Sequence, residues 1–255
     1  MQRNTITKPT SWHGTAISVR GAKHVADGRP CQDASKCIVT KVGYTVLLVA
    51  DGAGSAKHSQ IGSRTAVESA SKVLLQGLAS GAVTTPGEWR DLLESGMNGA
   101  RNAVEKSCNA DRPLKSVATT LLAMVIAPEF AITLSVGDCA GIVADDSGNW
   151  HLLSAPESGE YINQTFFLTE SDWKSHARFD YWEGSVASAV AISDGLELIA
   201  MNRGLPFEPF LGAMVDKLAV LPARSRRAAL RAYFSTYISG IRTDDDISFL
   251  AAWRS

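Results

Sequence analysis

The sequence of 255 residues has no excess of charge of either sign and no long hydrophobic run. Lys and Arg number 25 against 26 for Asp and Glu, so the formal net charge is -1. This balance provides no overall field that would hold nucleic acid or an anionic membrane. The apolar runs at residues 46–50 and 121–127 are far shorter than the roughly 20 residues that span a bilayer, and residues 1–10 contain no apolar secretory segment. We therefore expect a soluble, cytoplasmic protein that binds neither nucleic acid nor membranes.

Cysteine is scarce, and the motifs of several enzyme classes are missing. No Cys-x-x-Cys pair occurs, which favours free thiols in a reducing compartment. The four cysteines are Cys31, Cys37, Cys108 and Cys139. The glycines of residues 52–54 do not continue as a dinucleotide-binding loop, because Lys57 stands where the third glycine is required. A G-x-S-x-G elbow is absent as well, which removes the usual signal of an α/β-hydrolase.

The chain nevertheless has the composition of a folded protein, with 45% hydrophobic and 20% charged residues. Apolar runs and their periodicity predict the secondary structure. We expect strands at residues 14–19, 35–40, 44–50, 119–127, 130–136, 140–144, 150–153, 165–168, 186–192 and 247–253, and helices at 61–81, 87–107, 206–220 and 224–239. This order, dominated by antiparallel hairpins, predicts an α+β layered fold rather than a doubly wound nucleotide-binding fold.

Aspartates stand at the ends of several predicted strands. Asp51, Asp138 and Asp194 each come at the end of an apolar run, next to a glycine. Asp33 and Asp245 each precede a strand. A single aspartate in such a place is most often a turn residue. Five of them in one chain favour a second interpretation, in which the strand ends meet and the side chains converge.

Convergent carboxylates repel one another, and divalent cations relieve that repulsion. Oxygen ligands without His or Cys suit Mg²⁺ or Mn²⁺ better than Zn²⁺. Two such ions about 3.5–4 Å apart polarise a phosphoryl group and convert water to hydroxide near neutral pH. The residues therefore predict metal-assisted hydrolysis, with phosphate esters as the substrate class.

Six motifs, in this order, resemble the metal-dependent protein phosphatase family of type 2C, and in particular its bacterial serine/threonine phosphatase branch. They are Gln32-Asp33-Ala34, residues 49–54, Ala118-Thr119-Thr120, Val136-Gly137-Asp138, Ser193-Asp194-Gly195 and residues 245–248. The resemblance spans about residues 12–253 and implies a single phosphatase domain at residues 10–255. It also implies a four-layer α-β-β-α sandwich of two mainly antiparallel sheets flanked by helix pairs. The implied activity is that of a monomeric enzyme that removes phosphate from phosphoserine and phosphothreonine proteins.

The resemblance also implies which residues bind the metal ions. Asp51 would bridge two Mg²⁺ or Mn²⁺ ions, and the carbonyl oxygen of Gly52 would bind one of them. Asp194 and Asp245 would hold the second ion, and Asp33 would bind directly or through water. A hydroxide that bridges the two ions would attack the phosphomonoester, so Asp51 and Asp194 are also the catalytic candidates.

Further roles follow from the same resemblance. Asp138 matches a residue that helps to bind a third, weaker ion. Thr119 and Thr120 match threonines that support the sheet. His58 lies further along the loop after Asp51 than the family's histidine does, so it is either the general acid for the leaving group or an exposed residue that opens a helix.

An arginine of the first motif binds phosphate in this family, and four basic residues precede Asp33 here. They are Arg20, Lys23, His24 and Arg29, and all four are kept as phosphate-binding candidates. The last motif also departs from the family, because Asp246 stands where asparagine is usual. These departures leave an alternative function open, namely a catalytically inactive phosphoprotein-binding or regulatory module of the same fold. We expect the aromatic-containing segment at residues 154–180 to cover the site and select the partner.

Overall fold

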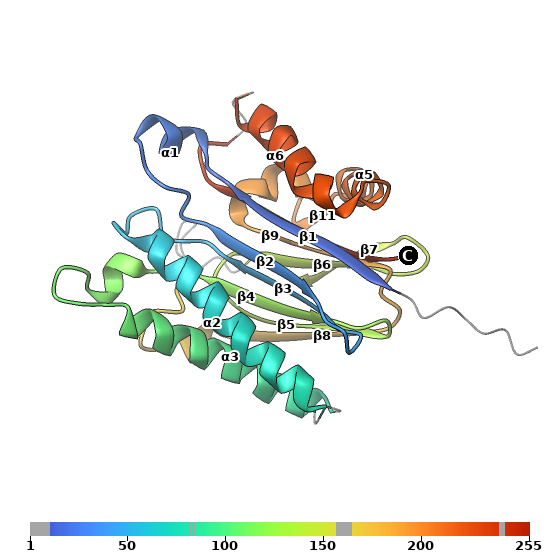
Figure 1. Ribbon diagram of the computed structural model, residues 1–255, viewed down its shortest axis with the longest axis horizontal. Coiled ribbons are helices and arrows are strands. Elements are labelled where there is room, and N and C mark those ends of the chain that lie inside the picture. Colours follow the sequence, from blue (N-terminus) through green and yellow to red (C-terminus); the bar gives the residue numbers. More distant parts are fainter. Residues whose placement is uncertain (1–10, 82, 84, 157–164, 240–242) are drawn as a thin grey trace, which may run out of the picture.

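The computed structural model describes residues 11–81, 83, 85–156, 165–239 and 243–255. Its longer strands form two five-stranded antiparallel sheets that pack face to face (Figure 1). The first sheet contains, in spatial order, β1 (Trp12–Val19), β12 (Ile247–Arg254), β9 (Ser188–Ile192), β6 (Ala140–Ala144) and β7 (Trp150–Ser154). The second contains β2 (Ala34–Val39), β3 (Thr45–Ala50), β4 (Leu121–Ile126), β5 (Phe130–Val136) and β8 (Arg178–Glu183).

Pairs of helices cover the outer faces of the two sheets. The helices α2 (Ser59–Ser80) and α3 (Pro86–Lys106) lie on the second sheet, and α5 (Glu208–Ala219) and α6 (Ala223–Ser239) lie on the first (Figure 1). The shorter elements are α1 (Ala22–Ala26), α4 (Glu197–Ala200), β10 (Met201–Asn202), β11 (Leu205–Pro206) and the 3₁₀ turns Leu114–Val117, Trp173–His176 and Asp194–Leu196. This arrangement confirms the expected α+β sandwich of two antiparallel sheets flanked by helices.

Three apolar layers hold the sandwich together. On β3, Leu48 faces the helices and packs in the same layer as Leu74 of α2, whereas Leu47 faces the other sheet and packs in the same layer as Leu250 of β12. On β12, Phe249 points the other way, into the layer beneath α5 and α6. Strands in such a sandwich are buried on both faces, which is why they were visible in the sequence as continuous hydrophobic runs.

Two expectations about the strands are wrong. Residues 165–168 do not form a strand, although the Leu168 N–H donates a hydrogen bond to the Thr119 carbonyl at 2.8 Å. The sequence also predicts no strand at β8, which begins within the segment at residues 154–180 that we expect to cover the site. β8 is an edge strand whose sequence, RFDYWE, alternates polar and aromatic residues and lacks the apolar run of a buried strand. Packing on one neighbour, rather than intrinsic hydrophobicity, makes it a strand.

The segment at residues 154–180 is only in part the loop that the sequence predicts. Residues 157–164 of this segment lie outside the described residues. Trp173 is buried in the layer beneath α3, so its expected contribution to a partner-binding surface is wrong. Thr165, by contrast, lies at the end of the sandwich where the aspartates gather, with its hydroxyl donating to Asp138 at 2.8 Å.

Helix α2 holds the loop that follows Asp51 through a close contact with the turn Leu114–Val117. Gly62 makes this contact possible, because a Cβ atom at this position would lie 2.0 Å from the Val117 carbonyl oxygen. The same stretch accepts hydrogen bonds from the loop: the His58 N–H donates to the Ser116 carbonyl at 2.7 Å, and the Ala53 N–H donates to the Ala118 carbonyl at 3.0 Å. The geometry after Asp51 therefore depends on this helix contact.

We expect Gly62→Ala to destabilise the protein, although alanine is the better helix former. The new methyl group would push against backbone, which cannot move aside as a flexible side chain can, and overpacking of this kind costs about 1–3 kcal/mol. Gly212→Ala in α5 is the matched control, because its nearest neighbour would be 4.0 Å away. That variant should gain about 0.5–1 kcal/mol from helix propensity. Urea unfolding measures both, and equal effects of the two variants would contradict the contact.

Candidate metal centre

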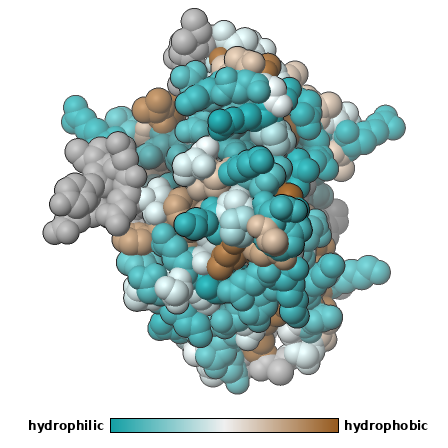
Figure 2. Space-filling view, turned by 90° about the vertical axis from the view of Figure 1, so that its left-hand side faces the viewer, coloured by the Kyte–Doolittle hydropathy of each residue, from teal (hydrophilic) through white to brown (hydrophobic). Residues whose placement is uncertain are grey.

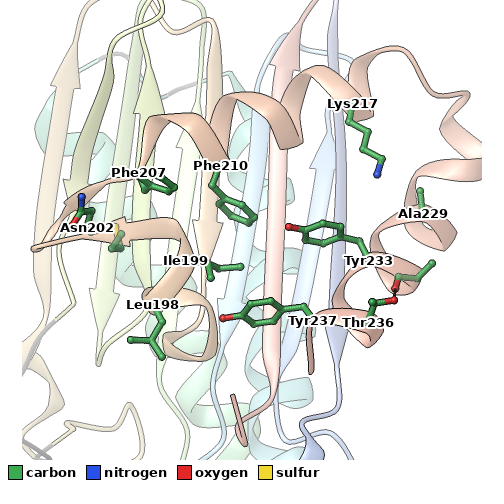
Figure 3. A pocket seen from close by; sticks show the side chains of 12 residues that line it. Leu198, Ile199, Asn202, Phe207, Phe210, Lys217, Ala229, Tyr233, Thr236 and Tyr237 are labelled. Carbon is green, nitrogen blue, oxygen red and sulfur yellow. Dashed lines mark hydrogen bonds between the residues drawn. The ribbon is translucent and has the colours of Figure 1, made fainter. Parts of the chain in front are cut away.

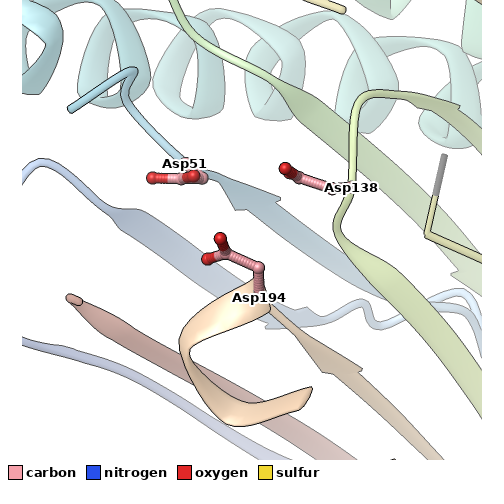
Figure 4. A group of neighbouring side chains, drawn as sticks. All are labelled: Asp51, Asp138 and Asp194. Atoms are coloured by element: carbon pink, nitrogen blue, oxygen red, sulfur yellow. The ribbon is translucent and has the colours of Figure 1, made fainter. Parts of the chain in front are cut away.

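The acidic side chains meet at one end of the sandwich, between the two sheets. Asp51 follows β3, Asp138 lies between β5 and β6, and Asp194 follows β9, so the two sheets both contribute. Figure 4 shows the three side chains pointing toward a common space. Each offers a carboxylate oxygen, and these oxygens all lie within 4.8 Å of one another. The surface at this end of the molecule is mostly hydrophilic (Figure 2).

The backbone at Asp51 is fixed by Thr119 and Thr120, the two residues just before β4. The Thr120 hydroxyl accepts the Asp51 N–H at 2.8 Å. The Asp51 carbonyl in turn accepts the Thr120 N–H at 2.8 Å and the Thr119 hydroxyl at 2.9 Å. Gly52 continues the pairing as an isolated bridge to Thr119, and a Cβ atom on this glycine would lie 2.7 Å from the Gln32 carbonyl oxygen. These contacts set the direction of the Asp51 side chain.

Asp33 is a neighbour of Asp51, and its side chain is buried, at 3% exposure. One carboxylate oxygen, Oδ2, accepts the Ser193 hydroxyl at 2.7 Å, and the Ser193 oxygen accepts the Ser248 N–H at 2.8 Å. The other oxygen, Oδ1, is buried and has no hydrogen-bond partner among the described residues. Asp138 repeats this pattern, because Oδ2 accepts the Thr165 hydroxyl and Oδ1 is buried with no partner in the part of the chain that the structure describes.

Buried acceptors without a donor are energetically costly, and a cation is the partner that would satisfy them. The oxygens come from carboxylates only, with no His or Cys in the cluster, which is the donor set that hard divalent ions prefer. The residues present therefore fit a Mg²⁺ or Mn²⁺ site.

The crowding of carboxylates raises their pKa values in the absence of metal. Burial raises the pKa of Asp194 to about 8, and the charges of Asp138, Asp33 and Asp245 add to the effect. Burial also raises the pKa of Asp33 to about 6, partly offset by hydrogen bonds that favour its charged form. The pKa of Asp51 is raised well above its usual range by burial and by the neighbouring acids. Negative charge is therefore unstable here without a counter-ion.

The remaining predicted ligand, Asp245, lies at the edge of the cluster. It is solvent-exposed, and it does not belong to the group of three whose oxygens lie within 4.8 Å. Burial is still the largest cause of its raised pKa, followed by the charge of Asp246, and Asp245 in turn raises the pKa of both Asp138 and Asp194.

The basic candidates lie in different surroundings. Arg29 reaches the loop after Asp51, with Nη1 donating to the Gly54 carbonyl at 3.3 Å. Arg20 donates from its Nη1 to the Arg29 carbonyl at 3.0 Å. Lys23 lies near Asp245, where its positive charge lowers that carboxyl's pKa. His24 is 5% exposed and lies against Asp246 rather than at the surface.

His58 is half-buried at the N-cap of α2, and its backbone N–H donates to the Ser116 carbonyl at 2.7 Å. Sequence reasoning did not assign a role to Ser193 or Ser248, although the motif residues beside them were recognised. Their contribution depends on two strands, β9 and β12, that pair side by side, and no local pattern reveals such a contact.

Two cavities bear on where a substrate could bind. One, of about 320 Å³, lies beside the loop after Asp51 and is lined by Arg29, Lys57 and their neighbours. A larger one, of about 1060 Å³, lies between the α4–β10 segment and the helices α5 and α6 (Figure 3). Its lining is largely apolar and aromatic and contains none of the predicted ligands, so it is not the metal site.

A protein-family model described as "Protein phosphatase 2C" matches residues 20–235. The chain is 27% identical to "Serine/threonine-protein phosphatase 3" of Escherichia coli (strain K12) over 260 residues, which covers 95% of this chain and 99% of the relative.

Two solved structures are similar to this chain as well. PppA of Pseudomonas aeruginosa, described as a key regulatory component of T6SS, superposes with a TM-score of 0.65 at 16% identity, covering 96% of this chain and 98% of that one. The catalytic domain of the serine threonine protein phosphatase PstP, solved in complex with two manganese ions, superposes with a TM-score of 0.57 at 17% identity, covering 96% and 99%. At these identities the structures show a common fold.

We expect the metal-free protein to lose stability as the pH rises. The folded-state pKa values of Asp33, about 6, and Asp194, about 8, lie above the ordinary value of 3.8. The folded chain therefore holds protons that the unfolded chain has already released, and the free energy of unfolding falls between pH 3.8 and about 8. Thermal unfolding in EDTA from pH 5 upward measures this fall, and added Mn²⁺ should reduce it. A stability that rises across this range would contradict the cluster.

A matched pair of substitutions should separate this effect from a general loss of negative charge. Asp194→Asn should raise the unfolding temperature in EDTA at pH 8, because it removes a charge from a repulsive group. Asp145→Asn should not, because hydrogen bonds from Asn149 and His151 lower the pKa of Asp145 to about 2 and favour its charged form. Equal shifts in the two variants would show that the cluster is not repulsive.

Proposed function

The chain belongs to the protein phosphatase 2C family, and on this premise we propose that it is a metal-dependent phosphatase acting on phosphoserine and phosphothreonine in proteins. The observation that carries the proposal is the convergence of Asp51, Asp138 and Asp194 from separate strand ends, with carboxylate oxygens within 4.8 Å. The similarity to an Escherichia coli serine/threonine-protein phosphatase over nearly the whole chain supports the substrate class.

We assign the metal ligands as follows. Asp51 and the Gly52 carbonyl would bind two Mg²⁺ or Mn²⁺ ions together with Asp194 and Asp245. Asp33 would complete the same site, and Asp138 would hold a third ion. Bound ions supply the hydroxide nucleophile and the positive charge that stabilises the transition state of phosphate hydrolysis. The manganese ions in the PstP complex support the choice of metal.

The chain's own residues have the remaining tasks of orientation and proton transfer. Asp51 and Asp194 would set the position of the nucleophile relative to the phosphorus. Thr119 and Thr120 fix the backbone at Asp51, and Asp194 directly follows Ser193 at the end of β9. His58, at the start of α2, is the candidate donor of a proton to the leaving serine or threonine oxygen. Asp245 is solvent-exposed, and we propose that the phosphorylated side chain reaches the metal site from this side.

Arg29 is the basic residue we favour for binding phosphate. It lines the cavity of about 320 Å³ beside the loop after Asp51, together with Lys57. His24 is less suitable because it is buried against Asp246. Guanidinium groups bind phosphate oxygens through charge-assisted hydrogen bonds, which are stronger than neutral ones.

No helix of the described residues is both long and apolar enough to cross a membrane. We propose that the enzyme works as a cytoplasmic monomer whose residues 10–255 form one domain.

Hydrolysis of a phosphothreonine peptide should require Mn²⁺ or Mg²⁺ and stop in EDTA. Asp51→Asn and Asp194→Asn should each reduce kcat by about 100-fold or more, because each removes charge from the ions that activate the nucleophile. Asp91→Asn, on the exposed surface of α3, is the control and should keep full activity. Folded protein that binds Mn²⁺ without turnover would instead support the regulatory module, and absence of Mn²⁺ binding would overturn the metal site.

Arg29→Ala should raise KM for the phosphopeptide about tenfold, because the loss of one charge-assisted hydrogen bond costs about 1.5–3 kcal/mol when it is fully made. Arg224→Ala removes the same charge from the exposed start of α6 and should leave KM unchanged. An unchanged KM for Arg29→Ala would transfer the role to Arg20 or Lys23.

A further inference from the structure

Asp246 is an acidic residue that does not face the metal cluster, although it directly follows the proposed ligand Asp245. It is 3% exposed and lies at the entrance to β12. Its side chain turns toward the loop at residues 20–32, which connects β1 to Asp33. A buried carboxylate of this kind needs donors on both oxygens, and all of the donors found here come from that loop.

Three nitrogen atoms surround the Asp246 carboxylate. Oδ1 accepts the backbone N–H of Gly21 at 2.7 Å, and Oδ2 accepts the backbone N–H of Gln32 at 2.5 Å. The Nδ1 atom of His24 lies 3.0 Å from Oδ1, at ion-pair distance but outside hydrogen-bond geometry, and this imidazole is itself 5% exposed. The carboxylate thus contacts the first residues of the loop, its middle and its end.

The backbone at Gly21 adds to this contact. A Cβ atom on Gly21 would lie 2.3 Å from the Asp245 carbonyl oxygen, so only glycine permits the approach. The next turn of the loop is joined to the same strand entrance by the Lys23 N–H, which donates to the Asp244 carbonyl at 3.4 Å. The loop and residues 244–246 therefore form one packed unit, with Asp33 at one end and Asp245 at the other.

We propose that Asp246 and His24 are a pair of positioning residues that set the place of Asp33 relative to Asp245 and thereby the affinity of the metal site. The inference rests on the proposed function for its ligand assignments. The buried histidine lies at ion-pair distance from this carboxylate, which carries more charge than an amide would.

An amide at position 246 cannot make the same contacts. Asparagine has one acceptor oxygen and one NH₂ group, which only donates. If its oxygen faces Gly21 and His24, its NH₂ group faces the Gln32 N–H, and two donors oppose each other. If it is flipped, the same conflict arises at Gly21. Either orientation leaves a buried backbone N–H without an acceptor and loosens one end of the loop.

The test compares Mn²⁺ affinity with turnover. In Asp246→Asn we expect the dissociation constant for Mn²⁺, measured by titration calorimetry, to rise at least tenfold, as is typical when a residue that orients a ligand is lost. At saturating Mn²⁺, kcat should stay within about twofold of the wild type. Asp244→Asn, which removes an exposed charge that also acts on Asp245, is the control for charge alone and should change the Mn²⁺ affinity by less than about twofold.

His24→Ala provides the second variant and also decides the outcome if Asp246→Asn fails to fold. We expect a smaller loss of Mn²⁺ affinity, about threefold, and a double variant whose loss is less than the product of the two single losses, because the two residues share one contact. Three outcomes would overturn the proposal. The Mn²⁺ affinity could be unchanged in both single variants, Asp246→Asn could lose no more Mn²⁺ affinity than Asp244→Asn, or the loss in the double variant could equal the product of the two single losses. Because binding is measured without substrate, wild-type protein that binds Mn²⁺ but lacks phosphatase activity would refute the proposed function and leave this inference tested.

Discussion

The mutual repulsion of closely spaced carboxylates is the constraint on which the architecture depends. Asp51, Asp138 and Asp194 are held with oxygens within 4.8 Å, and burial adds to the cost of their charge. Such a group persists only if the surrounding structure cannot relax away from it. The two sheets meet this requirement, because each aspartate lies at the end of a strand that is paired on both sides. The Thr120 hydroxyl also anchors the backbone at Asp51. The three apolar layers provide the stability that offsets the repulsion.

Much of the fold could be predicted, because the sandwich buries most of its strands on both faces. Continuous runs such as β3 and β4 are strong signals, and the helical period of α2 and α3 is equally clear. The errors fall where a segment takes its structure from a neighbour. The edge strand β8 lacks an apolar run. Residues 165–168 are apolar and predict a strand, but Phe166 and Leu168 instead pack into the layer beneath α2 and α3 without pairing as a strand.

The candidate site shows the same division. Strand-end position alone indicated which aspartates gather, since Asp51, Asp138 and Asp194 lie together. The sequence could not indicate what holds them. The hydrogen bond between Ser193 and Asp33 joins residues 160 positions apart, and the one between Gly21 and Asp246 joins residues 225 apart. Contacts of this range depend on the pairing of whole strands, and no local pattern encodes them.

The pairing of β1 with β12 has a consequence for how the protein folds. Trp12 lies opposite Arg254, and β12 runs between β1 and β9 in the interior of the first sheet. During synthesis the early strand has no partner until the last one leaves the ribosome, and the loop that ends in Asp33 lacks Asp246 for the same period. The loop before Asp33 therefore takes its observed position only once the residues at the start of β12 are present. A chain cut short before residue 246 would lack both the hydrogen-bonding partner of β1 in the first sheet and the carboxylate that holds the loop before Asp33.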